Sequence, residues 1–286
     1  MRIRDFLKIA KGGITTLVAL VAVTGFVSDP QAISKFILII PLLISGILAS
    51  FSASILNNIY DMDIDSTMKR TEYRNILLNS RTKNYFLSLA AGMLLVSMFI
   101  AYFFINLLTA LFIFLGFASY YFLYTIFLKR RTSWNIVIGG IAGSFPALAG
   151  WAAVSDNVSY TALFIAFLVF MWTPTHFWAL ASYREEDYKS AGVPMLPSLV
   201  GIEAGFRWII VNTIILVAYS LIPLLITSIH VGIVYYIVAL ISDAYLIYRL
   251  AMISASHYNK KQFRNAFIFS NFYLLLLLIS IWFVLI

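Results

Sequence analysis

The sequence predicts an all-α, polytopic integral membrane protein with about nine transmembrane helices. Apolar residues make up 62% of the 286 residues and charged residues only 11%, whereas soluble domains are about half apolar and roughly a quarter charged. The apolar residues form continuous runs, which are unlike the alternating strands of a β-barrel. They suffice for roughly nine spans of about 20 residues each. No cysteine is present, which excludes disulfides and thiol chemistry.

Nine apolar runs follow one another along the chain, and each falls within the length range of a membrane-spanning helix. The expected spans are residues 12–28, 36–56, 84–105, 107–127, 134–153, 159–181, 207–229, 231–250 and 265–286. Basic residues precede the first run, as in a signal peptide, but no small-residue cleavage site follows it. We therefore expect a retained first helix and a single transmembrane domain over residues 1–286.

The cations lie almost entirely on one side of this expected topology. The N-terminal segment and the connections after the even-numbered spans hold 19 of the 20 Lys and Arg residues, and Lys35 is the exception. The positive-inside rule makes that side, with the N-terminus, cytoplasmic. The two longest connections, 57–83 and 182–206, lie there with most of the acids, so we expect the active site in them. Topology explains the net charge of +8, and no nucleic-acid partner is expected. The absence of an N-terminal extension favours the plasma membrane of a prokaryote.

The first of these two loops opens with amides and three aspartates. If the preceding helix continues into the loop, Asn57, Asp61 and Asp65 recur at i, i+4 and i+8 and share one face. Two carboxylates one turn apart, with amide oxygens beside them, suit a hard cation. Mg²⁺ in particular is usually held by one or two carboxylates together with substrate phosphates. Asp63 points away from this face and is a weaker candidate.

Basic residues follow the acids. Arg70 and Arg74 lie one turn apart, with Lys69 beside them, where they could hold phosphate oxygens. An acidic cluster followed by a basic cluster is the charge order that a metal–diphosphate site needs. The alternative is a solvated loop whose cations obey the positive-inside rule and whose acids balance them.

These motifs resemble the UbiA-type intramembrane prenyltransferases. The pattern Asn57-Asn58-x-x-Asp61-x-x-x-Asp65 is similar to the first aspartate-rich motif of that family, whose fold has nine helices and a cytoplasmic active site. The closer resemblance is to its haem branch, the protoheme IX farnesyltransferases. It extends over Asp61-x-Asp63-x-Asp65-x-x-Met68-x-Arg70-Thr71-x-x-Arg74, Leu128-Lys129-Arg130-Arg131-Thr132, Trp134 to Gly140 with Gly150-Trp151-Ala152-Ala153, and the tract from Trp172 to Pro197.

The resemblance implies that the farnesyl group of farnesyl diphosphate is transferred to the 2-vinyl group of haem b, with addition of water, giving haem O and diphosphate. It implies Mg²⁺ as the cofactor. The implied metal ligands are Asn57, Asn58, Asp61, Asp65 and Asp187. The implied diphosphate-binding residues are Lys69, Arg70, Arg74, Arg184 and Lys189. The implied catalytic residues are Asp61, Asp65, Arg70, Arg74 and Asp187.

One histidine lies inside an expected span. His176 stands near the cytoplasmic end of the sixth span, two residues after Pro174. An ionisable residue within a span is a functional candidate, and here the resemblance leaves two roles, ligation of the haem iron or a hydrogen bond to a propionate. The alternative is a histidine that neighbouring helices satisfy.

Other functions stay open at this point. The same fold could take a quinone ring, a chlorin or a glycerol lipid as the acceptor, although the tract from Trp172 to Pro197 argues for haem. A cation transporter would place its acids at mid-membrane in broken helices, whereas these acids lie at the membrane edge. The sequence leaves open the prenyl length, the oligomeric state, and association with haem A synthase or a terminal oxidase assembly.

Overall fold

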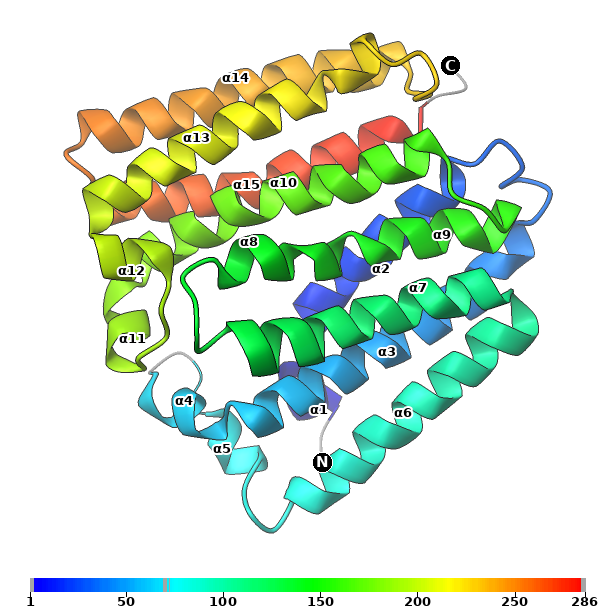
Figure 1. Cartoon of the computed structure of the whole chain (residues 1–286), viewed down its shortest axis with the longest axis horizontal. Helices are drawn as coiled ribbons and strands as arrows, with labels where there is room; N and C mark the ends of the chain where they lie inside the picture. The colour runs from blue at the N-terminus through cyan, green and yellow to red at the C-terminus, as the bar shows by residue number, and fades with distance from the viewer. Residues whose placement is uncertain (1–2, 69–70, 72, 284–286) are drawn as a thin grey trace.

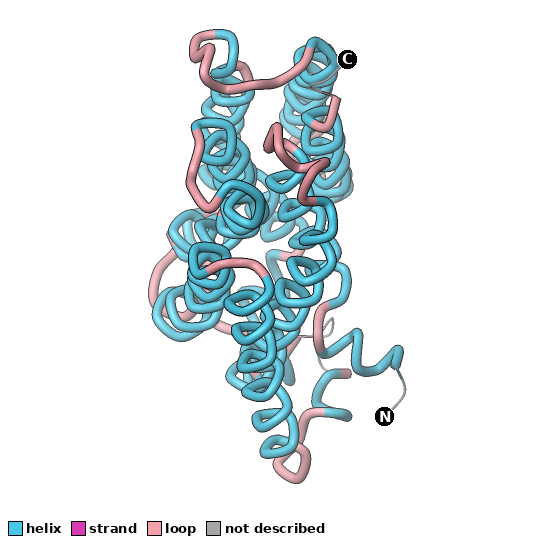
Figure 2. The backbone as a smooth tube through the Cα atoms, turned by 90° about the vertical axis from the view of Figure 1, so that its right-hand side faces the viewer, coloured by secondary structure: helices cyan, strands magenta, loops and turns pink. Residues whose placement is uncertain are grey.

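The computed structural model describes residues 3–68, 71 and 73–283. Within these ranges every regular element is helical (Figure 2). Eight helical segments are long and apolar enough to cross a membrane, and a further apolar helix, α2 (Gly12–Val27), is shorter at 16 residues. The expectation of an all-α, multi-pass membrane protein is therefore confirmed, with eight full-length spans and one short one in place of nine similar ones.

The eight long segments are built from one or more helical pieces each. They are η1 (Phe36–Leu38) with α3 (Ile39–Tyr60), α6 (Lys83–Phe104), α7 (Leu107–Ala118) with η2 (Ser119–Leu128), α8 (Asn135–Gly139) with η3 (Gly140–Gly143) and α9 (Phe145–Ser155), α10 (Tyr160–Tyr183), α13 (Ile202–Ser220) with η4 (Ile222–Leu224), α14 (Ile233–Ala255) and α15 (Lys260–Ile281). The short helices are α1 (Ile3–Ile9), α4 (Met62–Thr67), α5 (Arg74–Leu77), α11 (Glu185–Ser190) and α12 (Leu196–Val200).

Most expected spans agree with these bounds to within a few residues. The larger differences include those of α13, which begins at Ile202 where 207 was expected, α14, which ends at Ala255 where 250 was expected, and α15, which begins at Lys260 where 265 was expected. The early starts of α13 and α15 add charged residues, and in α13 Glu203 pairs with Arg207 at 2.8 Å, one turn apart. Such i, i+4 ion pairs, together with the backbone hydrogen bonds, stabilise helical turns that extend into water. An apolar run, in contrast, ends at the first charged residue.

The long helices pack side by side (Figure 1). On one side α3 contacts α6 and α7, and on the other α15 contacts α14 and α10. Helices α2, α9 and α10 join the two sides, because α2 contacts both α3 and α9, and α10 contacts α9, α13 and α15. Accordingly α10 has the largest buried share among the eight spans, 67%.

The α2–α9 contact is made by backbone atoms. A Cβ atom on Gly25 would lie 2.1 Å from the carbonyl oxygen of Ala147, and one on Gly150 would lie 1.9 Å from that of Ala22. Only glycine is compatible with such an approach, as is common where membrane helices meet through small residues. The short helix α2 is therefore fixed against α9 by shape.

A buried carboxyl group ties together three helices of the other side. Asp243 in α14 is 4% exposed and accepts hydrogen bonds from the Ser220 hydroxyl of α13 and the Tyr273 hydroxyl of α15, both at 2.7 Å. A polar group inside the membrane is stable only when it is bonded in this way. The network therefore has a structural role in holding α15 beside α14 and α13.

The two loops in which we expected the active site meet at one end of the molecule. Helix α4 lies beside α11 in Figure 1. Ile64 and Met68 of the first loop form one hydrophobic cluster with Val193 and Met195 of the second. Burial of these side chains stabilises the approach of the two loops, and we call this end of the molecule the loop end.

Candidate active site

The first functional motif stands at a break in the helix. Helix α3 ends at Tyr60 and α4 begins at Met62, with Asp61 between them at φ −95° and ψ 13°, a sparsely populated region where active-site residues often occur. The helical continuation on which the shared face of Asn57, Asp61 and Asp65 depended is therefore interrupted at Asp61. The helical bonds nevertheless continue across the break, since the Asp61 amide donates to the Asn57 carbonyl (2.9 Å) and the Asp65 amide to the Asp61 carbonyl (2.8 Å).

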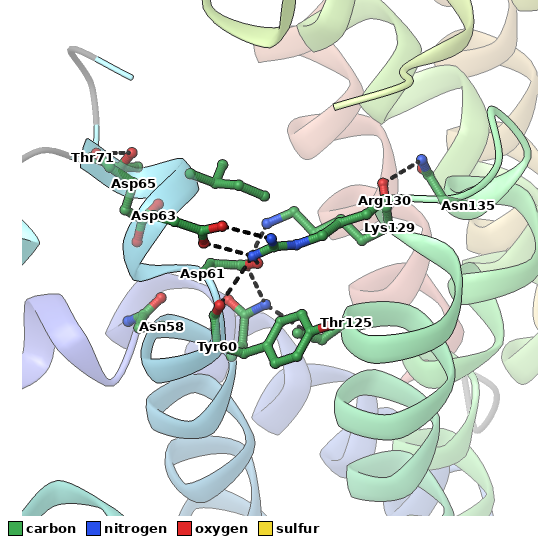
Figure 3. Close-up of polar contacts among 12 residues, drawn as sticks. Asn58, Tyr60, Asp61, Asp63, Asp65, Thr71, Thr125, Lys129, Arg130 and Asn135 are labelled. Atoms are coloured by element: carbon green, nitrogen blue, oxygen red, sulfur yellow. Dashed lines mark hydrogen bonds and ion pairs between the residues drawn. The ribbon is translucent and has the colours of Figure 1, made fainter. Parts of the chain in front are cut away.

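Asp61 is buried and surrounded by donors (Figure 3). Its Oδ2 accepts hydrogen bonds from the Asn57 side-chain amide, at 2.9 Å, and from the Lys129 ammonium. Arg130 Nη2 lies 3.5 Å from its Oδ1. This Oδ1 is fully buried and has no hydrogen-bond partner. A buried carboxylate is stable only beside positive charge, which Lys129 and Arg130 supply here.

Asp65 is neutralised by a cation of its own loop. It is 4% exposed, and Arg74 Nη1 lies 3.2 and 3.0 Å from its two carboxylate oxygens. The same Nη1 donates to Asn58 Oδ1 at 3.2 Å. Burial lowers the pKa of Arg74, but the adjacent Asp65 carboxylate outweighs this and raises it. Arg74 therefore remains charged and joins two of the expected metal ligands.

Asp63 points away from this face, as expected, and its side chain is 65% exposed. It accepts two hydrogen bonds from Arg130, both at 2.7 Å. These bonds lower the pKa of Asp63, although its partial burial opposes the shift. Arg130 also donates to the Tyr60 carbonyl at 3.0 Å and stacks on the Tyr60 ring at 4.8 Å. Arg130 thus fastens the end of η2 to the α3–α4 junction.

The cations that reach Asp61 stand directly after a π-helix. The segment η2 (Ser119–Leu128) has the wider π-helical turn, which is rare and occurs frequently at functional sites. Its Thr125 hydroxyl accepts from the Asn57 amide at 3.0 Å, and its Tyr120 hydroxyl accepts from Lys11 at 3.0 Å. Lys11 also donates to Asn57 Oδ1. The segment therefore supports the motif and directs the next residues, Lys129 and Arg130, towards it (Figure 3).

The sequence-based site did not include these partners. Lys129 and Arg130 stand in a motif that we used only for the resemblance, and their run of cations was the available signal. Nothing in the local sequence marked Lys11, Tyr120 or Thr125, because their contacts with Asn57 join segments far apart in the chain, 46 positions apart in the case of Lys11.

The expected residues of the second loop pair within their own short helix. Arg184 lies 3.9 Å from Asp187, and Lys189 lies 2.6 Å from Glu185. Asp187 Oδ2 is buried and has no hydrogen-bond partner. Among the residues that the structure describes, no three His, Asp or Glu side chains form one group that could hold a metal ion. Asp187 therefore does not join Asp61 and Asp65 in a single such group. The expected diphosphate ligands Lys69 and Arg70 lie outside the described residues.

His176 belongs to α10 and its ring contacts α15. It is 6% exposed, and its Nδ1 is 2.7 Å from the Ser270 hydroxyl. Its ring stacks on Trp172 at 4.2 Å and lies 4.6 Å from Phe267. Neighbouring helices therefore do hold this histidine, and its functional role stays a prediction.

The chemistry of these groups suits a hard divalent cation. Asp61 Oδ1 and Asp187 Oδ2 are buried oxygens without a hydrogen-bond donor, and oxygen atoms are the ligands that Mg²⁺ prefers. Lys129 and Arg130 stand beside Asp61, and Arg74 stands beside Asp65; these cations can form strong bonds with phosphate oxygens. The site thus combines oxygen ligands for a metal with cations for an anionic substrate.

A membrane-embedded helical fold with carboxylates and cations at the loop end fits an integral membrane enzyme that acts on an anionic substrate. The model of the UbiA prenyltransferase family matches residues 13–284, and the chain belongs to this family. Two solved structures share the fold. A digeranylgeranylglyceryl phosphate synthase superposes with a TM-score of 0.78 at 17% identity, covering 98% of this chain and 97% of the other. A UbiA homologue from Archaeoglobus fulgidus bound to DMAPP and Mg²⁺ gives 0.67 at 16% identity, covering 97% and 99%.

The curated relatives with similar sequences identify a narrower group within the family. The chain is 54% identical over 282 residues to protoheme IX farnesyltransferase 2 of Picrophilus torridus, covering 99% of this chain and 98% of that one. It is 39% identical over 280 residues to protoheme IX farnesyltransferase of Saccharolobus islandicus, covering 97% and 95%.

Proposed function

We propose that this protein transfers the farnesyl group of farnesyl diphosphate to the 2-vinyl group of haem b and so forms haem O. The observation that carries the proposal is the 54% identity, over nearly the whole chain, to a protein named protoheme IX farnesyltransferase. The relation to digeranylgeranylglyceryl phosphate synthase, at 17% identity, is one of fold and does not favour a glycerol lipid as the acceptor.

The reaction balances as haem b, farnesyl diphosphate and water giving haem O, diphosphate and a proton. The bond between farnesyl C1 and the diphosphate oxygen breaks, and a bond from C1 to the terminal carbon of the vinyl group forms. The oxygen of water adds to the other vinyl carbon, and one of the water protons is released. The main electrostatic requirement of the site is to stabilise the negative charge that develops on the leaving diphosphate.

We assign Mg²⁺ to the oxygen ligands of the two loops. The proposed ligands are Asn57, Asn58, Asp61 and Asp65 of the first loop, together with Asp187 of the second loop, which among the described residues is not grouped with Asp61 and Asp65. When bound, Mg²⁺ would supply positive charge to the phosphate oxygens. The buried oxygens of Asp61 and Asp187 that accept no hydrogen bond support this assignment, as does the Mg²⁺ in the Archaeoglobus fulgidus homologue.

The cations of the chain would bind the diphosphate. Lys129 and Arg130 converge on Asp61, and Arg74 converges on Asp65, so all three stand where a metal-bound diphosphate would lie. In our proposal they stabilise the charge on the leaving group as the C1–O bond breaks. Lys69, Arg70, Arg184 and Lys189 are further proposed contacts of the diphosphate.

The acceptor is placed on the α10 side of the site. The tract from Trp172 to Pro197 carries the resemblance to haem-modifying enzymes, and His176 within it is the proposed haem contact. We further propose that the loop end and the N-terminus face the cytoplasm of a prokaryotic cell, on the strength of the Lys and Arg distribution. Both substrates would then enter from the bilayer and the cytoplasmic surface.

Mass analysis of extracted haem tests the proposal. The gene is expressed in a host that lacks its own enzyme, and membranes are supplied with haem b, farnesyl diphosphate and either Mg²⁺ or a chelator. We expect haem O only in the presence of Mg²⁺. Unmodified haem in membranes that demonstrably contain the protein would refute the assignment. A longer prenyl chain on the haem would change only the identity of the prenyl diphosphate donor.

A further inference from the structure

The contact between His176 and Ser270 fixes where the imidazole carries its proton. Ser270 is 1% exposed. Its hydroxyl donates to the carbonyl of Phe267, three residues earlier in α15, at 2.7 Å. A hydroxyl group has a single proton to donate. The Phe267 carbonyl can only accept, so the two 2.7 Å contacts of Ser270 Oγ are both hydrogen bonds only when Oγ accepts from His176 Nδ1–H, and we assign the protons in this way.

The imidazole is neutral in these surroundings. Among the described residues, its hydrogen-bond and ring contacts are with the Ser270 hydroxyl and the rings of Trp172, Phe177 and Phe267, and none of these groups carries a charge. A buried cation without an acidic partner is costly. A neutral imidazole has one N–H, which is given to Ser270, so its other nitrogen, Nε2, has a lone pair and no proton.

Helix α15 also fixes the orientation of the ring. The Trp172 indole N–H donates to the backbone carbonyl of Ser270 at 2.7 Å, and the Trp172 ring stacks on His176 at 4.2 Å with an interplanar angle of 25°. One residue of α15 thus holds two residues of α10 that stand one turn apart, through its hydroxyl and its carbonyl. The direction of Nε2 is set by this arrangement.

The lone pair of Nε2 is available to a ligand. In the described part of the chain Nε2 makes no hydrogen bond, and it is not among the side-chain nitrogen and oxygen atoms that are both fully buried and unpaired. A nitrogen of this kind can bind a metal ion but cannot donate to a carboxylate. Of the two roles that the sequence left open, iron ligation fits this geometry and a hydrogen bond to a propionate does not.

We propose that Ser270 is a positioning residue that holds His176 in the Nδ1–H tautomer, so that Nε2 ligates the iron of the haem acceptor. The inference rests on the proposed function for the identity of the acceptor. In metal-binding histidines the partner of the second ring nitrogen commonly fixes tautomer and orientation, and its removal typically costs about 10–100-fold in affinity.

The experiment measures haem binding and coordination in the purified, detergent-solubilised protein. Haem b is titrated and followed by its Soret absorption, and resonance Raman spectra of the ferrous complex report the iron–histidine stretching band. We expect the band in the unsubstituted protein and its loss in His176→Ala, with recovery on addition of imidazole. Ser270→Ala should weaken haem binding about tenfold and shift or broaden the band.

Ser280→Ala is the matched control. Ser280 lies in the same helix, is 3% exposed and donates to the carbonyl three residues earlier at 2.7 Å. Ser280→Ala therefore removes a comparable buried hydroxyl and its hydrogen bond but leaves the contacts of His176 unchanged. Retention of the band in His176→Ala overturns iron ligation. Equal affinity and spectra for Ser270→Ala and Ser280→Ala overturn the positioning role. Haem binding without a histidine band overturns this inference alone, whereas no haem binding at all overturns the proposed acceptor as well.

Discussion

The ammonium group of Lys129 bonds directly to the carboxylate of Asp61, 68 positions earlier in the chain, where Asp61 is 1% exposed. The pair joins the end of the π-helix η2 to the α3–α4 junction. A buried carboxylate that loses its cation is destabilised by about 3–5 kcal/mol. The same cation lies where the proposed diphosphate would bind, so this contact links the stability of the loop end to its chemistry.

Substitution of Lys129 should therefore affect both properties. We expect Lys129→Ala to lower kcat/KM for farnesyl diphosphate by about 100-fold, as does loss of one donor to a developing anion, and to lower the melting temperature. Arg131→Ala is the control, since Arg131 is an exposed cation that contacts the Phe127 ring at 5.8 Å. Similar losses in both variants would contradict a specific role for Lys129.

The two buried aspartates should be indispensable for turnover. Asp61→Asn and Asp65→Asn keep the size of the side chain but remove the negative charge that the proposed Mg²⁺ requires. We expect no detectable haem O and near-normal protein levels. Asp63→Asn, at an exposed position beside them, should retain most of the activity. If Asp61→Asn still forms haem O and requires the same concentration of Mg²⁺, Asp61 is not a metal ligand.

The Asp63–Arg130 pair should give an acid-sensitive contribution to stability. Because the hydrogen bonds from Arg130 lower the pKa of Asp63, the carboxylate in the folded protein binds its proton only at a lower pH than in the unfolded chain. The contribution is complete above the unfolded pKa of about 3.9 and is lost as the pH falls through the lowered value. It amounts to less than about 1 kcal/mol, since the group is largely exposed.

Melting curves of the parent protein and Asp63→Asn check this sign. Their difference in melting temperature should be constant between neutral pH and about pH 5 and should shrink as the pH falls below about 3.9. High salt should also reduce it. A difference that grows on acidification would mean that the charged form of Asp63 destabilises the fold.

The backbone contact between α2 and α9 should tolerate no side chain. Gly25→Ala and Gly150→Ala would place a Cβ atom about 2 Å from a carbonyl oxygen of the facing helix, and overpacking of this kind costs about 1–3 kcal/mol or more. Gly92→Ala in α6 is the control, because no heavy atom lies within 4 Å of its added Cβ. Thermal unfolding in detergent should show a clear loss for the first two and none for the third.

The spans were predictable from the sequence because each needs a continuous apolar run, and this requirement is local. The early starts of α13 and α15 were not, since charged residues end an apolar run without ending a helix. Glu203 and Arg207 show why, because their one-turn pair stabilises the extra turns in water. The shortness of α2, at 16 residues, follows the shortness of its apolar run, residues 12–28.

The site was predictable where its contacts are local. Asn57 and Asp61 are one turn apart, and their side chains do meet at 2.9 Å. The Arg184–Asp187 and Lys189–Glu185 pairs were also within reach of sequence reasoning, yet we assigned those cations to the diphosphate alone. The approach of Lys129 to Asp61 depends on how η2 lies against α3, and no periodic pattern encodes the wide turn of η2. Such contacts require the tertiary structure.

The paired glycines of α2 and α9 have an entropic consequence. Burying an aliphatic side chain costs about 0.5–1 kcal/mol of lost rotamer freedom, whereas glycine has no rotamers to lose. Lipid provides no hydrophobic driving force for helix association, and α2 is only about 24 Å long, so it offers little surface with which to offset such a cost. Contact through Gly25 and Gly150 lets α2, which is shorter than the eight full-length spans, join the bundle without ordering a side chain at its closest point.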